Sequence, residues 1–259
     1  MILLSAVLYL KGTIGWIMVA ISVAFWTSLL HELEHDLIHF MYFKKNKFMQ
    51  DLMMLGVWLF RPMTINPWFR RDLHFHHHRV SGSKTDVEER GVTNGEKWGF
   101  KRLLTTADIF LGGVLRANIV RKDIIDAVKK GELPKEQALM FKKSKIYGMM
   151  PFTLALYFIW YFFLIHYSIH YISVFFHLGY ESSAFIQAQF KWINPLVAIL
   201  IFPNLLRMFC LHFITSNMHY YGDVESGNVM QQTQVLNKWY FIPFQFFCFN
   251  FGSTHAIHH

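Results

Sequence analysis

Three long apolar stretches with at most one charged residue set the pattern of this chain. Gly12 to Leu30 contains no Asp, Glu, Lys or Arg, and Ile146 to Tyr180 is uncharged for 35 residues. Trp192 to Phe213 is the third stretch, broken only by Pro203 and Arg207. A bilayer core requires about 20 apolar residues of helix, so each stretch predicts a membrane span. At about 1.5 Å per residue the second stretch exceeds one crossing, and part of it should lie outside the bilayer or at its surface.

Shorter apolar segments and a polar middle region complete the pattern. The segments Met1 to Leu10, Phe48 to Phe60 and Trp239 to Gly252 are too short to cross alone, which predicts interfacial or re-entrant elements. The first can also be the end of a helix whose start is missing. In the polar region we predict a helix from Asp123 to Lys130 that stops at Gly131, a second helix over Pro134 to Lys145, and a turn-rich segment over Ser81 to Gly95.

Composition supports a membrane protein. Hydrophobic residues make up 53% of the 259 residues and charged residues only 16%, against about 25% charged in soluble domains. This balance argues against a water-soluble globule, and the apolar mass argues against disorder. We therefore predict one all-α domain over residues 1–259, a membrane-embedded helical bundle with a helical cap.

The distribution of charge predicts an orientation. The formal net charge is +8, and 21 of the 25 Lys and Arg residues lie between Lys44 and Lys145. By the positive-inside rule this region faces the cytoplasm. The first span then runs inward and ends near His31, and everything after His212 is cytoplasmic again. The basic charge thus indicates a membrane orientation, and we expect no nucleic-acid partner.

Three clusters contain most of the 15 histidines. The first is His31, His35 and His39, which continue the first span at positions i, i+4 and i+8 and should share one helical face. The second and third repeat the pattern His-x-x-His-His, and Asn217-Met-His219 follows the last span; the repeated residues are His74, His77, His78, His255, His258 and His259. The predicted topology brings all of them to one side of the membrane.

So many imidazoles indicate metal chemistry. Neutral imidazole suits Fe, Zn, Cu and Ni, and the number of histidines exceeds what one ion binds, which suggests two metals. Iron with open coordination positions is the usual arrangement for activating dioxygen. His39 can be a ligand or only a neighbour of one. His76 lies on the wrong helical face, and the remaining isolated histidines are interpreted as bystanders: His166, His170, His177 and His212.

Arg207 permits two interpretations. Its place near the inner end of the last span favours a side chain that extends to the lipid headgroups. The sharper alternative is that Arg207 pairs with a carboxylate or with the headgroup of an acyl substrate.

The motifs resemble the three histidine boxes of the integral-membrane fatty acid desaturase/hydroxylase superfamily, as His31-x3-His35, His74-x2-His77-His78 and His255-x2-His258-His259. The resemblance implies a four-span bundle that holds two non-haem irons. It further implies that His219 completes the ligand set, with Asn217 beside it as a possible ligand or neighbour. The implied activity is O2-dependent oxidation of a fatty acyl chain carried as free acid, thioester or lipid, and desaturation is favoured.

Departures from the family pattern leave the reaction open. The first box has three intervening residues, as in membrane decarboxylases that form terminal alkenes, and His219-Tyr-Tyr-Gly222 is similar to a segment of alkane hydroxylases. The chain also stops within the third box, which suggests a fragment truncated at the C-terminal end. The sequence shows no Fe–S cysteine cluster and no dinucleotide fingerprint. A separate ferredoxin, rubredoxin or cytochrome b5 is therefore the expected electron donor.

Two rival interpretations belong to other classes. His31-Glu32-x-x-His35 satisfies the H-E-x-x-H pattern of zinc proteases, although such a site has no use for two His-x-x-His-His boxes. A metal transporter should instead hold its ligands at the middle of the bilayer.

Overall fold

A computed structural model describes most of the chain as helix. It describes every residue except 82, 84, 94–95, 108–111, 220–224, 226–227, 250 and 255–259, and only the backbone of 112–114, 140, 144–146 and 229. The longer helices are α1 (Ile2–Leu10), α2 (Trp16–Ile38), α3 (Lys47–Phe60), α4 (Pro67–Val80), α7 (Gly112–Lys129), α8 (Lys135–Gly148), α9 (Phe152–Phe175), α10 (Ala184–Leu196) and α11 (Phe202–Met218). The shorter elements are α5 (Val87–Gly91), α6 (Phe100–Thr106), η1 (Val197–Ile201), α12 (Val229–Gln232), η2 (Trp239–Phe241), α13 (Ile242–Gln245) and α14 (Phe251–Thr254).

Three helical segments are long and apolar enough to cross a membrane, which confirms the three predicted spans. They are Trp16–Ile38, Phe152–Phe175 and Ala184–Met218. The third is longer than the sequence indicated, because α10, η1 and α11 follow one another without a break. Pro195 lies inside α10 and removes one helical hydrogen bond, and the π-helical turn η1 follows directly.

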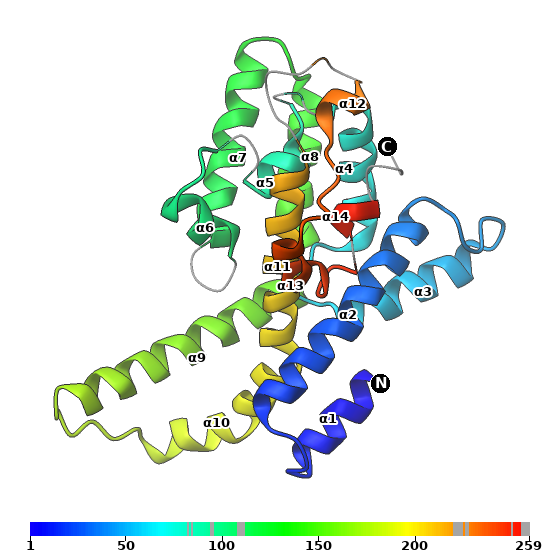
Figure 1. The fold of residues 1–259 in the computed structure, drawn as a ribbon. Coiled ribbons are helices and arrows are strands. Elements are labelled where there is room, and N and C mark those ends of the chain that lie inside the picture. Colours follow the sequence, from blue (N-terminus) through cyan, green and yellow to red (C-terminus); the bar gives the residue numbers. More distant parts are fainter. Residues whose placement is uncertain are drawn as a thin grey trace.

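Helix α2 packs through a face of small residues that leads into the histidines. Its fully buried positions include Ala20, Ala24 and Ser28, and small side chains let helix backbones approach closely. The same face continues through His31 and His35, which are also buried. In Figure 1, α2 and α11 occupy the centre of the molecule, while α9 and α10 extend away at the lower left.

Helices α4 to α8 form a separate polar unit, here called the cap. Its core joins Leu73 of α4 and Val87 of α5 to apolar residues of α7 and α8. The helix expected over Asp123 to Lys130 belongs to the longer α7, and Gly131 follows it with φ +73°. The helix expected from Pro134 is α8. The segment Ser81 to Gly95, expected to be turn-rich, contains turns and bends in its described residues and also the short helix α5.

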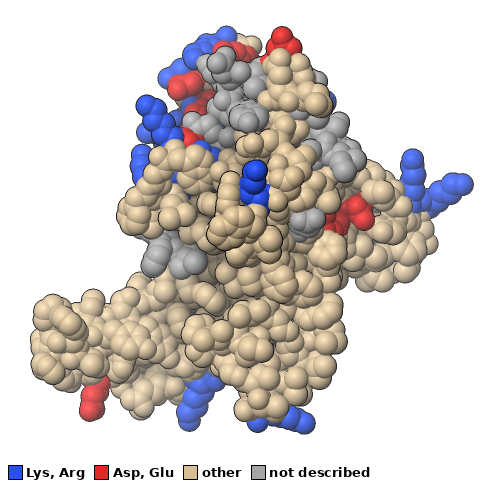
Figure 2. Space-filling view, in the orientation of Figure 1, with Lys and Arg blue, Asp and Glu red and all other residues tan. Residues whose placement is uncertain are grey.

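Charged residues are unevenly distributed over the surface. Figure 2 shows Lys, Arg, Asp and Glu gathered over the upper part of the molecule, where the cap lies, and few of them over the apolar helices below. This distribution agrees with a lipid-facing lower part, since charged side chains are costly inside a bilayer.

Candidate metal centre

Four imidazoles from two helices converge on one point. They belong to His35, His39, His74 and His78, and this set is called the first group. The Nε2 atom of His74 lies 3.1 Å from the Nε2 atom of each of the other three. Ligands about 2.1 Å from one metal ion lie about 3.0 to 3.4 Å apart, so the spacing fits a shared metal ion.

The local helices explain this convergence. His35 and His39 lie one turn apart at the end of α2, with His39 as the residue that caps the helix. His74 and His78 lie one turn apart on α4, whose first turn is fixed by the Asn66 side chain and by Pro67. Each helix therefore presents a pair of imidazoles at i and i+4, and the packing of α4 against α2 brings the pairs together.

A second group joins another histidine of α4 to residues from two other parts of the chain. His77 comes from α4, His219 follows α11, and Glu89 lies on α5; their potential ligand atoms all lie within 4.8 Å of one another. The Oε1 atom of Glu89 is 3.7 Å from the Nε2 atom of His219. All three side chains are buried. A carboxylate and two imidazoles are a suitable donor set for iron.

Two carboxylates contact the far nitrogens of these imidazoles. The Nδ1 atom of His77 lies 2.8 Å from the Oδ2 atom of Asp86, and the Nδ1 atom of His74 lies 3.1 Å from the Oε2 atom of Glu88. Metal-binding histidines generally donate their second N–H to such a carboxylate, which leaves the other nitrogen for the metal. His74 and His77 thus have the surroundings of metal ligands.

The same carboxylates set the protonation of the metal-free site. Burial lowers the pKa of the His77 imidazole, but the charge and hydrogen bond of Asp86 outweigh burial and raise that pKa to about 10. Burial raises the pKa of the Glu88 carboxyl, but His74, His77 and Arg70 outweigh it and hold that pKa well below its usual range. The Glu88 carboxylate therefore carries the negative charge that a protonated histidine or a metal-bound imidazole requires.

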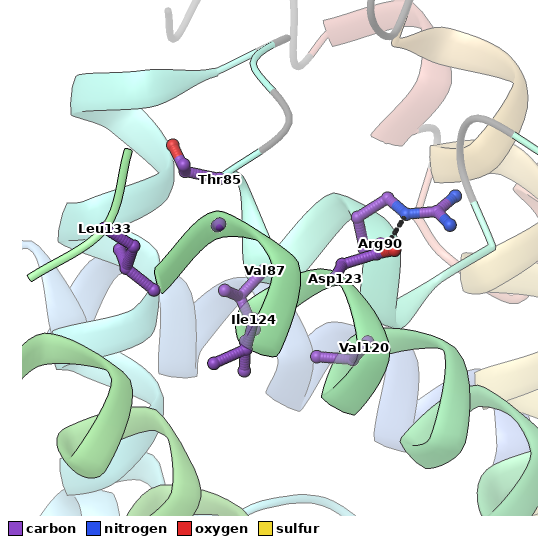
Figure 3. A pocket seen from close by; sticks show the side chains of 8 residues that line it. Thr85, Val87, Arg90, Val120, Asp123, Ile124 and Leu133 are labelled. Atoms are coloured by element: carbon purple, nitrogen blue, oxygen red, sulfur yellow. Dashed lines mark hydrogen bonds and ion pairs between the residues drawn. The ribbon is translucent and has the colours of Figure 1, made fainter. Parts of the chain in front are cut away.

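Helix α5 is held in place by contacts with α7. Arg90 of α5 forms an ion pair with Asp123 of α7, and Val87 lies near Val120 and Ile124, which line a small pocket with it (Figure 3). Asp86 caps α5 by accepting a hydrogen bond from the backbone N–H of Glu89. These contacts fix the short turn that presents Asp86, Glu88 and Glu89 to the histidines.

The comparison with protein families agrees with this site. The model of the family described as "Fatty acid desaturase" matches residues 14–259. The chain belongs to the fatty acid desaturase family. Searches of curated proteins and of solved structures found no match. Family membership suggests an oxidoreductase of the desaturase superfamily that uses a bound metal.

His31 has different surroundings from the other histidines of this desaturase-family chain. Its Nδ1 atom lies 3.0 Å from Nη2 of Arg61 and 3.4 Å from Nη1 of Arg70, and both arginines form ion pairs with Glu34. Arginine only donates hydrogen bonds, so Nδ1 of His31 accepts and the ring proton of the neutral imidazole lies on Nε2. His31 belongs to neither group. The expectation that His31, His35 and His39 project together therefore holds only for the last two.

The remaining predicted residues are placed as follows. His255, His258 and His259 lie outside the described residues. The side-chain amide of Asn217 donates to the carbonyl of Phe213. His76 faces Gln137 and the carbonyl of Thr85, as expected of a residue on the other face of α4. The histidines interpreted as bystanders belong to neither group: His166, His170, His177 and His212.

Sequence reasoning missed the acidic residues of the site. Asp86, Glu88 and Glu89 come from the segment predicted to be turn-rich, to which no chemical role was assigned. Three acidic residues within four positions, shortly after the second histidine cluster, were the available signal. Their roles depend on the packing of α5 against α4.

Proposed function

We propose that this protein is a membrane-bound, O2-dependent oxidoreductase that removes hydrogen from unactivated C–H bonds of a fatty acyl chain, with desaturation as the favoured reaction. The observation that carries the proposal is the convergence of four imidazole Nε2 atoms within a chain of the desaturase family. Two non-haem irons are the proposed cofactor. Each of the two groups would hold one of them.

The described residues divide naturally between two metal ions. His35, His39, His74 and His78 would hold the first, while His77, Glu89 and His219 would hold part of the second. The sequence pattern supplies further imidazoles for the second ion in the third box: His255, His258 and His259. We leave His31 out of this set, because its Nδ1 accepts hydrogen bonds from arginine.

The overall reaction requires an external source of electrons. Desaturation converts R–CH2–CH2–R′, O2, two electrons and two protons into R–CH=CH–R′ and two molecules of water. When bound, the iron pair supplies the redox chemistry that activates O2. The chain's own residues orient the ligands through Asp86 and Glu88. They also keep the site dry, because His74, His77 and Glu89 are buried.

The electron donor is proposed to be a ferredoxin, a rubredoxin or a protein of the cytochrome b5 type. Lys and Arg gather over the cap (Figure 2), and this region contains most of the basic residues of the chain. Acidic donors would dock on such a surface. The charge pattern also supports a cytoplasmic position for the cap and the site in a multi-pass membrane protein.

Two measurements test the proposal together. The purified protein should contain about two Fe per chain, and with a redox partner and O2 it should convert defined fatty acids into products that mass spectrometry identifies. A new internal double bond indicates a desaturase, an alcohol a hydroxylase, and a terminal alkene one carbon shorter a decarboxylase. One Zn per chain with no O2-dependent product would refute the proposal and would favour the protease pattern of His31 and His35.

Matched variants of one helix provide the control. His78→Ala removes a ligand of the first group and should lower both the iron content and the activity. His76→Gln changes another face of the same helix but retains a side chain that can bond to Gln137 or to the Thr85 carbonyl. Its iron content should equal that of the wild type. Equal iron content in both variants would contradict the assignment of the first group.

A further inference from the structure

Arg207 is a buried cation without a hydrogen-bond partner. Its side chain is 1% exposed, and none of its three guanidinium nitrogens has a hydrogen-bond partner in the part of the chain that the structure describes. Leaving an ionised group buried and unpaired costs several kcal/mol. A fold retains such a residue readily when a bound anion completes it.

The neighbouring charges do not neutralise Arg207. Arg61 and Arg70 share Glu34, which is completely buried. Glu32 is the other nearby carboxylate, and its Oε1 atom also has no hydrogen-bond partner, so it does not pair with Arg207 in this structure. Arg70 also pairs with Glu88, whose Oε1 atom lies 3.9 Å from the Nε atom of Arg70. None of the nearby carboxylates therefore hydrogen-bonds to Arg207 among the described residues.

The burial of Arg207 also rules out the expected contact with lipid headgroups. Asn204, Leu205 and Arg207 belong to the buried face of α11. That face packs against α2, and Arg207 lies close enough to His31 and Glu34 for electrostatic interaction. The guanidinium group therefore lies inside the protein, beside the helix that contains the first histidines.

His31 offers a second donor in the same region. Its Nδ1 accepts from Arg61, so the proton of the neutral ring lies on Nε2. This Nε2 atom is buried and has no hydrogen-bond partner among the described residues. A buried N–H donor and a buried guanidinium group, both without hydrogen-bond partners among the described residues and near enough to interact electrostatically, are suited to a small anion.

We propose that Arg207, together with the Nε2–H of His31, binds the carboxylate of an unesterified fatty acid. This inference rests on the proposed function, because the fatty acyl chain is its substrate. A carboxylate matches the planar guanidinium group and supplies a negative charge for the unpartnered Arg207 side chain. A thioester or ester has no charge at that end and would leave Arg207 unpaired.

The position of this site limits which carbons can react. His31 precedes His35 by four residues on α2, which corresponds to about 6 Å along the helix. A carboxylate beside His31 therefore places the first few carbons of the chain, rather than its middle, near the first group. Products modified close to the carboxyl end are the expected consequence.

Binding to the full-length, detergent-solubilised protein tests the inference without turnover. The probes are dodecanoate, methyl dodecanoate and dodecyl phosphate, which share a chain length and differ in the head. Wild type should bind dodecanoate more tightly than the ester. Arg207→Gln should weaken dodecanoate binding about tenfold or more, since a hydrogen bond to a charged group is lost, and should leave ester binding unchanged. Arg207→Lys should give an intermediate affinity, because the charge remains and the planar fork is lost.

A second variant separates the two roles that His31 could have. His31→Gln should weaken dodecanoate binding while its iron content remains that of the wild type. Loss of iron in this variant would make His31 a metal ligand and overturn its place here. Equal binding of dodecanoate by wild type and Arg207→Gln would overturn the proposal, as would equal binding of acid and ester by the wild type. Binding of dodecyl phosphate alone, dependent on Arg207, would assign the site to a lipid phosphate instead.

Failure of this inference can be distinguished from failure of the proposed function. Arg207-dependent binding of dodecanoate without O2-dependent conversion would leave the anion site standing and refute the oxidoreductase. Conversion of fatty acids, together with dodecanoate binding that does not depend on Arg207, would support the oxidoreductase and refute the anion site. If Arg207→Gln fails to fold, the comparison of acid with ester in the wild type and the Arg207→Lys variant still decide the question.

Discussion

The contact between Asp86 and His77 allows the second group to be tested most sharply. Asp86 is completely buried and has two roles: its Oδ2 atom lies 2.8 Å from Nδ1 of His77, and its Oδ1 atom accepts from the backbone N–H of Glu89. Asp86→Asn retains the capping ability, because Asn caps helices as well as Asp does. It removes the negative charge that orients the His77 ring.

The expected effect is on metal affinity rather than on folding. Loss of a carboxylate behind a metal-binding histidine typically weakens metal binding about 10- to 100-fold, which corresponds to about 1.4 to 2.7 kcal/mol. Asp86→Ala also removes the side chain that caps the N-terminus of α5, and should lower the free energy of unfolding by about 1 kcal/mol more. The two variants therefore separate the helix-capping role of Asp86 from its contact with His77.

Competition with a chelator of known affinity, titrated against the iron-loaded protein, measures this difference. In Asp86→Asn one equivalent of iron should be released at lower chelator concentration, and the other should be released as in the wild type. Asp123→Asn is a control, because Asp123 pairs with Arg90 at the back of α5. Wild-type release of both equivalents from Asp86→Asn would refute the argument that Asp86 supports a metal ligand.

Three further predictions concern the same site. Glu89→Gln should reduce the iron content from about two to about one per chain, as elemental analysis would detect; two retained irons would remove Glu89 from the ligand set. In chelator-treated protein, the pKa of His77 is raised to about 10, whereas a histidine in the unfolded chain has a pKa of about 6.5. The attraction between protonated His77 and Asp86 therefore stabilises the fold fully below about pH 6.5, and this stabilisation is lost as the pH rises toward about 10. The difference in Tm between wild type and Asp86→Asn should therefore shrink from pH 7 to pH 10, and a constant difference would contradict the protonated state of His77. Removal of iron should itself lower the Tm, because a metal that binds only the folded state stabilises it; an unchanged Tm would indicate that no metal was bound.

The sequence by itself determined the spans and the residue types available to the candidate site. Uncharged runs of sufficient length predict membrane helices whatever their packing, because a helix satisfies all the backbone hydrogen bonds of a single apolar segment within that segment. The spacing of His74, His77 and His78 likewise determined that they belong to one or two adjacent faces of a helix. Local periodicity carries this information, so α2, α4, α9 and the pairing of histidines one turn apart followed from it.

The tertiary structure decided which of those histidines meet. Positions i, i+4 and i+8 drift around a helix, because 3.6 residues make one turn, so His31 and His39 do not point in the same direction. The packing of α4 against α2 brings His35 and His39 next to the histidines of α4, whereas His31 accepts hydrogen bonds from Arg61 and Arg70. No local pattern contains this choice, since the partners lie 30 or more residues away along the chain.

The acidic residues and Arg207 illustrate the same division. The sequence around Asp86, Glu88 and Glu89 indicates a turn-rich segment. Their orientation toward the histidines depends on the packing of α7 and α8 with α5. The sequence around Arg207 is compatible with contact to lipid headgroups or with burial. Only the packing of α11 against α2 places the side chain inside the protein. Local sequence determines which groups are available, whereas long-range packing determines the charges that surround each one.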